Sequence, residues 1–176
     1  AHLCDKGTGV VSYLYGRFTM EIKMKDNERI EDLQCKGLKI IQNKKWFCFG
    51  MDAVLLTNYC DIRNNSKIVD LGTGTGIIPI LLSGKRNYSK AYGIEIQPEV
   101  AEMAERSVKL NALQEKIEIL NIDLKDTLKY LDAGSFDAVI SNPPYKLNNS
   151  GIINPDDKKA ISRHEIKCTL EDVIST

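Results

Sequence analysis

Ser-Lys-Ile-Val-Asp-Leu-Gly-Thr-Gly-Thr-Gly, residues 66–76, is the stretch that decides the fold of this chain. Its apolar first half predicts a buried strand, its glycines a sharp turn, and the apolar residues 77–82 a following helix. Pro79 falls in the first turn of that helix, where its missing N–H costs little. This order predicts an α/β domain that binds a ligand where the strand ends.

The glycine spacing indicates which ligand this turn binds. Dinucleotide sites use G-x-G-x-x-G, whereas this chain has G-x-G-x-G with Asp70 two residues ahead of it. An acid there would repel a pyrophosphate but can accept hydrogen bonds from an ammonium group. The spacing therefore favours S-adenosylmethionine (SAM) over a nicotinamide dinucleotide. The predicted cofactor contacts in this stretch are Asp70, Gly72, Thr73, Gly74 and Gly76.

A second motif, Asn142-Pro143-Pro144-Tyr145, follows the apolar run 136–141, which predicts another short buried strand. Two prolines fix φ and remove two N–H donors, so the peptide displays acceptors beside an aromatic ring. The Asn142 amide oxygen and the Pro143 carbonyl could each accept one N–H of a planar NH₂ group, while Tyr145 stacks on it. The alternative is an ordinary proline-rich turn.

The chain between these motifs predicts two further strands that end in acids. Residues 91–95 end in Glu95, which could bind both hydroxyls of a ribose or be a surface residue. A helix is expected over 98–112 and a strand over 116–120. Asp123 could accept from an adenine amino group or cap a helix over 124–131. Ile96 and Leu124 follow these acids and are expected beside the cofactor.

Taken in order, these motifs resemble those of class I SAM-dependent methyltransferases that methylate amino groups. The resemblance implies a Rossmann-like sheet with helices on both faces, and a catalytic role for Asn142, Pro143, Pro144 and Tyr145. Residues 46–56, Trp-Phe-Cys-Phe-Gly-Met-Asp-Ala-Val-Leu-Leu, resemble a segment of the bacterial family that methylates N6 of an adenine beside the anticodon of valine tRNA. That likeness places Phe49 and Asp52 near the methionine end of the cofactor and implies tRNA as the substrate.

Other functions stay open at this point. Glutamine methyltransferases of release factors act on a similar planar NH₂, but they carry a helical N-terminal domain. Methylation of amino groups in ribosomal RNA or DNA would suit the same motifs. A non-catalytic SAM-binding module is a further alternative, which an intact Asn142-Pro143-Pro144-Tyr145 motif disfavours.

Composition limits the function without naming it. The 176 residues are 43% hydrophobic, enough for one α/β core, and contain no apolar run long enough to cross a membrane. Five cysteines without a C-x-x-C pair and two histidines argue against a zinc site and suggest free thiols in the cytoplasm. The formal net charge of zero predicts that any RNA contact is local. The candidate cations for such a contact are Lys44, Lys45, Lys158, Lys159, Arg163, His164 and Lys167, although a single residue of this kind is more often solvated surface than an RNA contact.

The chain divides into three parts. Residues 1–19 are expected to be a leader outside the fold, because Met20 looks like a natural start. Residues 20–60 predict a hairpin over 33–49, with a turn at Asn43-Lys44, and a helix over 51–60. Residues 61–176 predict the methyltransferase domain, with a polar loop over 146–165 and a helix opening at Thr169. A domain of this class would continue with a fifth parallel strand and an antiparallel pair, so this one is expected to be C-terminally incomplete.

Overall fold

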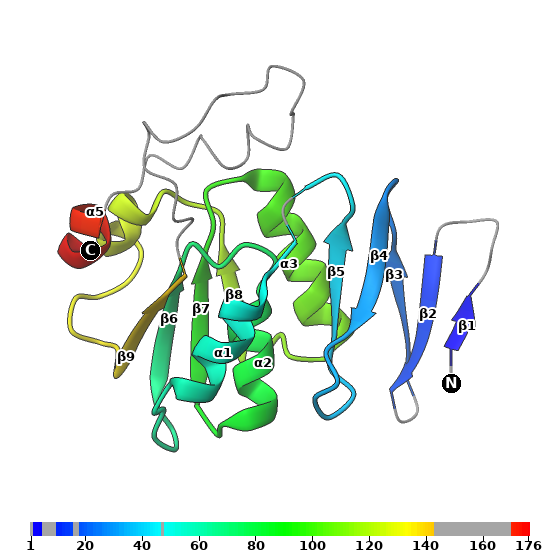
Figure 1. Ribbon diagram of the computed structural model, residues 1–176, viewed down its shortest axis with the longest axis horizontal. Helices are drawn as coiled ribbons and strands as arrows, with labels where there is room; N and C mark the ends of the chain where they lie inside the picture. Colours follow the sequence, from blue (N-terminus) through cyan, green and yellow to red (C-terminus); the bar gives the residue numbers. More distant parts are fainter. Residues whose placement is uncertain (1, 5–9, 16–17, 47, 143–169) are drawn as a thin grey trace.

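The computed structural model describes residues 2–4, 10–15, 18–46, 48–142 and 170–176. Its centre is a four-stranded parallel sheet in the order β8-β7-β6-β9 (Figure 1). The strands of this sheet are β6 (Lys67–Leu71), β7 (Lys90–Ile94), β8 (Ile117–Leu120) and β9 (Ala138–Ser141). The helices are α1 (Met51–Tyr59), α2 (Ile77–Lys85), α3 (Pro98–Leu110), the 3₁₀ helix η1 (Leu124–Lys129) and α5 (Leu170–Ser175). Each strand and helix predicted from residue 51 onward is therefore present, with boundaries shifted by a few residues.

Both faces of the sheet are covered, as predicted for the class I methyltransferase fold. Side chains alternate along a strand, so Ile68 of β6 faces one side and Val69 the other. The first side packs against α1, α2 and α3 in the main apolar core. The second side packs against η1 and α5, where Leu124 and Val173 join the smaller cluster. The doubly covered sheet explains why its strands are apolar runs.

β9 forms one edge of this sheet. In the described part of the chain its only partner strand is β6, in the register Asp70↔Ile140 and Leu71↔Ser141. Val139 is 62% exposed on the face opposite the main core. An edge strand presents unpaired backbone groups, and among the described residues no strand pairs with the outer edge of β9.

The predicted N-terminal hairpin exists, but with a different partner strand. β5 (Lys39–Asn43) matches the expected β-rich run, yet it pairs with β4 (Glu28–Asp32), upstream of the predicted range. The hairpin connection is therefore residues 33–38, where Gln34, Lys36 and Gly37 have positive φ, and not Asn43-Lys44. The prediction was wrong because β4 is polar and contributes only Ile30 as an apolar residue.

Residues set aside as a leader take part in a sheet. β2 (Val10–Tyr15) lies between β1 (His2–Cys4) and β3 (Phe18–Lys23), and both pairs are antiparallel. The run Val-Val-Ser-Tyr-Leu-Tyr is rich in β-branched and aromatic residues, which explains the strand. Excluding all of residues 1–19 from the fold was therefore incorrect, while their origin as a leader stays a prediction.

The N-terminal strands are fastened to α3 by a second apolar cluster. Ile22 of β3 and Ile41 of β5 pack with Met103 and Leu110 of α3, and Trp46 packs against them. Since α3 also covers the parallel sheet, the hairpin and the methyltransferase sheet share one helix. Within the described residues, no helix is long and apolar enough to cross a membrane.

Candidate active site

The predicted site residues gather where β6, β7 and β9 end. Asp70 is the fourth residue of β6 and pairs in register with Gly93 of β7 and Ile140 of β9. Glu95 comes directly after β7, and Asn142 directly after β9. Parallel strands end at the same edge of the sheet (Figure 1), so these three residues come from neighbouring strand ends.

The glycine turn is built on left-handed backbone. Gly72, Gly74 and Gly76 have φ values of 74°, 57° and 81°, which L side chains rarely adopt. A Cβ added at Gly72 or Gly74 would meet nothing within 4 Å, so backbone conformation and not crowding requires these glycines. Gly76 is the residue before α2, and the Ile80 N–H donates to its carbonyl at 3.1 Å. The open space over the turn fits a ligand that approaches the backbone closely.

Asp70 is a buried carboxylate with an unsatisfied oxygen. It is 1% exposed, and its Oδ2 accepts from the Thr73 hydroxyl at 2.7 Å, while Oδ1 has no hydrogen-bond partner. Burial raises the pKa of Asp70 to about 7; the Thr73 hydrogen bond lowers it and the charge of Glu95 raises it further. A buried acceptor without a donor is costly, which fits a site completed by a cationic ligand.

Glu95 is held by the glycine turn. Its Oε2 accepts from the Gly74 N–H at 3.0 Å, and its Oε1 accepts from the Gln97 N–H at 2.9 Å. Burial raises the pKa of Glu95, and the N–H groups of Gln97, Gly74 and Ile96 oppose the rise. A carboxylate has about four acceptor positions, so this buried group can accept ribose hydroxyls as well.

Asn142 is joined to α1. Its Nδ2 donates to Asp52 Oδ2 at 3.4 Å, across 90 residues of sequence. Asp52 lies in the first turn of α1, where an acid is favoured by the helix dipole, and its Oδ1 occupies the space above Gly50. A Cβ at Gly50 would require the Asp52 carboxylate to move from this position. The segment around residue 50 and the start of the Asn142 motif thus meet in the structure, while the predicted position of Phe49 and Asp52 beside the cofactor stays a prediction.

The remaining predicted residues have more ordinary surroundings. Phe49 is partly buried against the main core, and Leu124 against the smaller cluster. Ile96 is 49% exposed beside Glu95. Asp123 caps η1, since its Oδ1 accepts from the Lys125 N–H at 3.0 Å, so the capping alternative is observed and an adenine contact stays a prediction. Pro143, Pro144 and Tyr145, together with the loop cations at 158–167 and the expected N-cap residue Thr169, lie outside the described residues.

Three supporting residues were not predicted. A Cβ at Gly93 would lie 2.8 Å from Thr73 Cγ2, so this glycine makes room for the residue that hydrogen-bonds Asp70. Gln97 donates to Glu95, and Asn121 Nδ2 donates to the Glu95 carbonyl at 2.8 Å. Polar residues within three positions after a strand end were the signal that could have revealed Gln97 and Asn121.

The arrangement fits an adenosyl cofactor with a cationic end. Asp70 can accept from an ammonium group, Glu95 from ribose hydroxyls, and the turn leaves room for the ligand between them. Among the described residues, no cluster of His, Cys, Asp and Glu could hold a metal ion.

Comparison with known families assigns this site to a family. The model of the methyltransferase small domain matches residues 50–154, more than half of the chain. The chain belongs to this family. The enzymes of this family use SAM, which confirms the predicted cofactor and is incompatible with the nicotinamide alternative.

Curated relatives share most of the chain. A tRNA1(Val) (adenine(37)-N6)-methyltransferase of Bacteroides thetaiotaomicron is 29% identical over 80% of this chain and 58% of its own length. One from Porphyromonas gingivalis is 33% identical over 71% of this chain and 51% of its own length. The chain spans about half the length of the curated relatives it matches. Among solved structures, Trm5 of Methanocaldococcus jannaschii in complex with adenosine has a TM-score of 0.54 at 22% identity, over 70% of this chain and 37% of that one, which shows the same fold.

Proposed function

We propose that this methyltransferase transfers the methyl group of SAM to the exocyclic N6 amine of an adenine in structured RNA, with tRNA as the substrate. The observation that carries the proposal is the position of Asn142. It follows β9, the neighbour of the strand that ends in the glycine turn, and Asp52 engages its Nδ2. The amide oxygen is then the atom of this side chain that can accept an N–H from a substrate amine.

The chemistry explains why such an acceptor is needed. An exocyclic adenine amine is a poor nucleophile because its lone pair is delocalised into the ring. Acceptors at Asn142 and at the Pro143 carbonyl would hold both hydrogens and direct the lone pair at the methyl carbon. SAM supplies that carbon as an electrophile on a positively charged sulfur. The nitrogen becomes acidic once it carries the methyl group, so the lost proton can pass to water, and positioning does most of the catalysis.

Cofactor binding is assigned to the ends of β6 and β7. Asp70 would accept from the ammonium group of SAM with its unpaired Oδ1, and Glu95 would accept from the ribose hydroxyls. Phe49 and Asp52, which precede and open α1, would flank the methionine end. Tyr145 would stack on the target base, which must leave its own stack to reach the pocket.

The choice of tRNA rests on the named relatives. Eight of them carry the name tRNA1(Val) (adenine(37)-N6)-methyltransferase, at 24–33% identity. The antiparallel strands before α1 also favour this substrate over a release-factor glutamine, whose enzymes carry a helical N-terminal domain. A cytoplasmic location would follow from a tRNA substrate.

A labelling experiment tests the proposal. The chain is incubated with methyl-labelled SAM and separate pools of tRNA, ribosomal RNA, DNA and release factor. We expect label in tRNA, recovered as N6-methyladenosine after digestion to nucleosides. Label confined to the release factor would overturn the RNA assignment and support the glutamine alternative.

A variant pair tests the role of Asn142. Asn142→Ala should abolish labelling while calorimetric SAM binding stays within a few-fold of the unmodified chain. Asn87→Ala, an exposed asparagine after α2, is the matched control and should leave both unchanged. Loss of SAM binding by Asn142→Ala as severe as that caused by Glu95→Ala would contradict the assigned role.

A further inference from the structure

The turn after β5 presents two lysines on the active-site side of the molecule. β5 ends at Asn43, at the end of the molecule toward which the parallel strands also point (Figure 1). Lys44 and Lys45 follow it and are exposed. Within the residues that the structure describes, neither lysine takes part in an ion pair.

The backbone of this turn is fixed. Asn43 is 7% exposed; its Oδ1 accepts from the Lys45 N–H at 2.9 Å, and its Nδ2 donates to the Asp26 carbonyl at 3.5 Å. The Lys44 N–H donates to the Asn27 carbonyl at 2.9 Å. Trp46 closes the turn through its N–H, which donates to the Asn43 carbonyl at 3.1 Å, and its side chain packs against the second apolar cluster. The lysine side chains therefore extend from a backbone that is fixed by hydrogen bonds within the turn and to the facing turn at residues 26–27.

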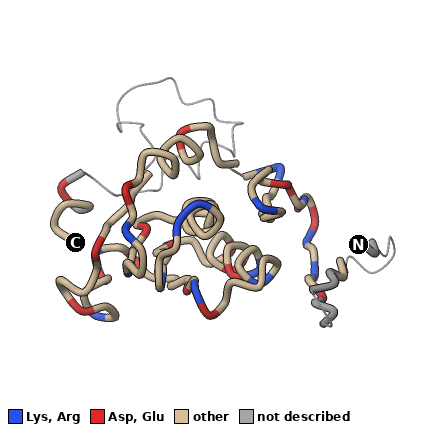
Figure 2. The backbone as a smooth tube through the Cα atoms, turned by 90° about the horizontal axis from the view of Figure 1, so that it is seen from below, with Lys and Arg blue, Asp and Glu red and all other residues tan. Residues whose placement is uncertain are grey.

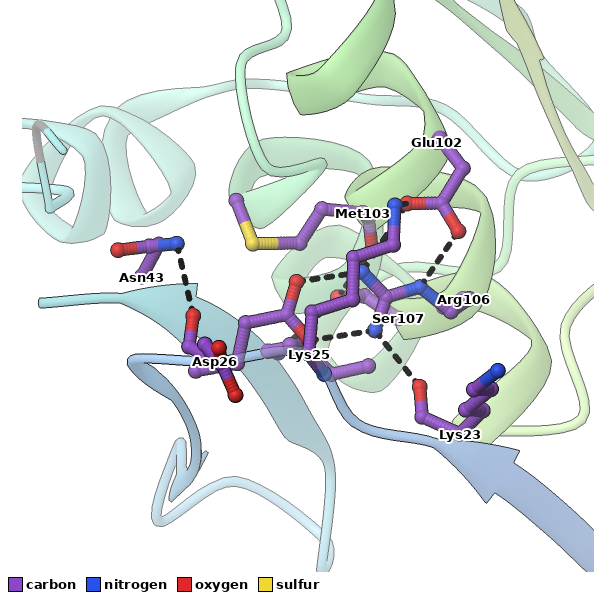
Figure 3. Close-up of polar contacts among 10 residues, drawn as sticks. Lys23, Lys25, Asp26, Asn43, Glu102, Met103, Arg106 and Ser107 are labelled. Carbon is purple, nitrogen blue, oxygen red and sulfur yellow. Dashed lines mark hydrogen bonds and ion pairs between the residues drawn. The ribbon is translucent and has the colours of Figure 1, made fainter. Parts of the chain in front are cut away.

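A charged network fixes the hairpin to the helix that begins at the cofactor site. Arg106 of α3 donates to Glu28 of β4 through both terminal nitrogens, at 2.6 and 2.7 Å, and to the Lys23 carbonyl at 3.0 Å. Figure 3 shows the same guanidinium reaching Glu102, one turn back on α3, which also pairs with Lys25 at 2.8 Å. Since α3 begins three residues after Glu95, the network sets the position of the lysine turn relative to the cofactor.

Elsewhere on the described surface, positive charge is mixed with negative charge. Lys, Arg, Asp and Glu are interspersed along the described backbone, without one side of a single sign (Figure 2). Several other lysines are neutralised in ion pairs: Lys25, Lys39, Lys90 and Lys129. An RNA phosphate near the active site would meet the Lys44-Lys45 pair as an unneutralised local charge. Asp26, exposed on the facing turn, is the acid that opposes it.

Building on the proposed RNA substrate, we propose that the turn Asn43–Trp46 is an RNA-anchoring element. The ammonium groups of Lys44 and Lys45 bind backbone phosphates of the RNA, and the Arg106 network holds the turn at a fixed place relative to the target base. Asn43 is a positioning residue, because it acts through the turn.

Charge reversal with a matched control tests this element. Lys44→Glu/Lys45→Glu is compared with Lys36→Glu/Lys109→Glu, which changes the net charge equally at exposed lysines on the far end of the hairpin and of α3. Binding to an anticodon stem-loop transcript of valine tRNA is measured by fluorescence anisotropy over about 50–200 mM salt. The first variant should bind at least about ten-fold more weakly. The plot of its log binding constant against log salt concentration should be shallower by about 1.5 in slope. The control should bind within about two-fold of the unmodified chain, and SAM affinity should be unchanged in both.

An opposite charge change gives an opposite prediction. Asp26→Asn removes the acid on the facing turn without touching the lysines, so it should strengthen binding of the same transcript two- to three-fold. A gain here shows that local charge at this turn controls RNA binding, while the unchanged SAM affinity of the lysine variant excludes misfolding as the cause of its loss.

The outcomes separate this inference from the proposed function. Equal binding by the lysine variant and its control, with RNA still methylated, would overturn the anchor and leave the function standing. An unmodified chain that neither binds the transcript nor methylates any RNA would overturn both.

Discussion

Two pairs of carboxylates differ in whether the described chain supplies a positive charge beside them: Glu28 of β4 with Glu102 of α3, and Asp70 with Glu95 at the ends of β6 and β7. Glu28 and Glu102 share the guanidinium of Arg106, whereas among the described residues no Lys or Arg pairs with Asp70 or Glu95. Burial alone would raise all four pKa values. The hydrogen bonds and charge of Arg106 instead lower the pKa of Glu28 and Glu102, while those of Asp70 and Glu95 stay raised. The first pair joins the hairpin to α3, and the second is the pair that we propose a ligand completes.

Removing the cation of the first pair should have the largest effect. Arg106 is 13% exposed and the Glu28 side chain 1%, so Arg106→Met leaves a buried, uncompensated charge. We expect the free energy of unfolding to fall by about 3–5 kcal/mol, measured by urea denaturation. Replacing both partners, as Arg106→Met/Glu28→Leu, should recover much of the loss. A double variant as unstable as Arg106→Met alone would show that packing of the arginine stem, and not its charge, holds the hairpin.

Neutralising Asp70, one member of the second pair, should change the free energy of unfolding in the opposite direction. Asp70→Asn keeps an acceptor for Thr73 but removes a carboxylate whose pKa is about 7 in the folded chain and near 4 when unfolded. Such a group costs stability progressively as the pH rises from about 4 to about 7. Asp70→Asn should therefore stabilise the ligand-free chain by roughly 1–2 kcal/mol at pH 8 and weaken SAM binding about 50-fold. A variant destabilised at pH 8 would contradict the idea that the charge of Asp70 has no compensating partner among the described residues.

SAM affinity should depend on pH for the same reason. An ammonium group is attracted to the ionised form of Asp70, and the ligand-free chain is largely protonated there below pH 7. Affinity should rise about ten-fold between pH 6 and pH 8, with a proton released on binding. Calorimetry in two buffers of different ionisation enthalpy measures the proton count. The Asp70→Asn variant, with its residual affinity, should show a flat profile over this window.

Local sequence patterns were sufficient for the strands and the glycine turn. β6 and the turn after it are one continuous stretch, in which the apolar run, the acid and the glycines follow one another. Asp70, Glu95 and Asn142 could be named because each lies at or directly after the carboxyl end of a strand, and parallel strands end together. The family and the cofactor followed from these residues.

Contacts between distant segments could not be read from the sequence. Arg106 and Glu28 are 78 residues apart, and Asn142 and Asp52 are 90 apart. β4 was missed because its pattern is polar; its side chains meet partners on α3 and β5 and not the main core. The Asp52–Asn142 contact joins two segments that were each predicted for a different reason. Only the folded chain shows that they meet.

The smallest expected effect concerns the exposed ion pair between Lys25 and Glu102. Lys25 pairs with Glu102 at 2.8 Å, but the two side chains are 54% and 41% exposed, so water screens the interaction. Lys25→Met should lower the free energy of unfolding by less than about 1 kcal/mol, measured under the same denaturation conditions as Arg106→Met. Arg106 still donates to Glu102 at 2.8 and 3.0 Å in this variant, so no buried charge is left without a partner. If Lys25→Met lowered the free energy of unfolding as much as Arg106→Met, side-chain exposure would not distinguish the two contacts. The contrast between carboxylates paired with a cation of the chain and carboxylates proposed to bind a ligand would then lose its physical basis.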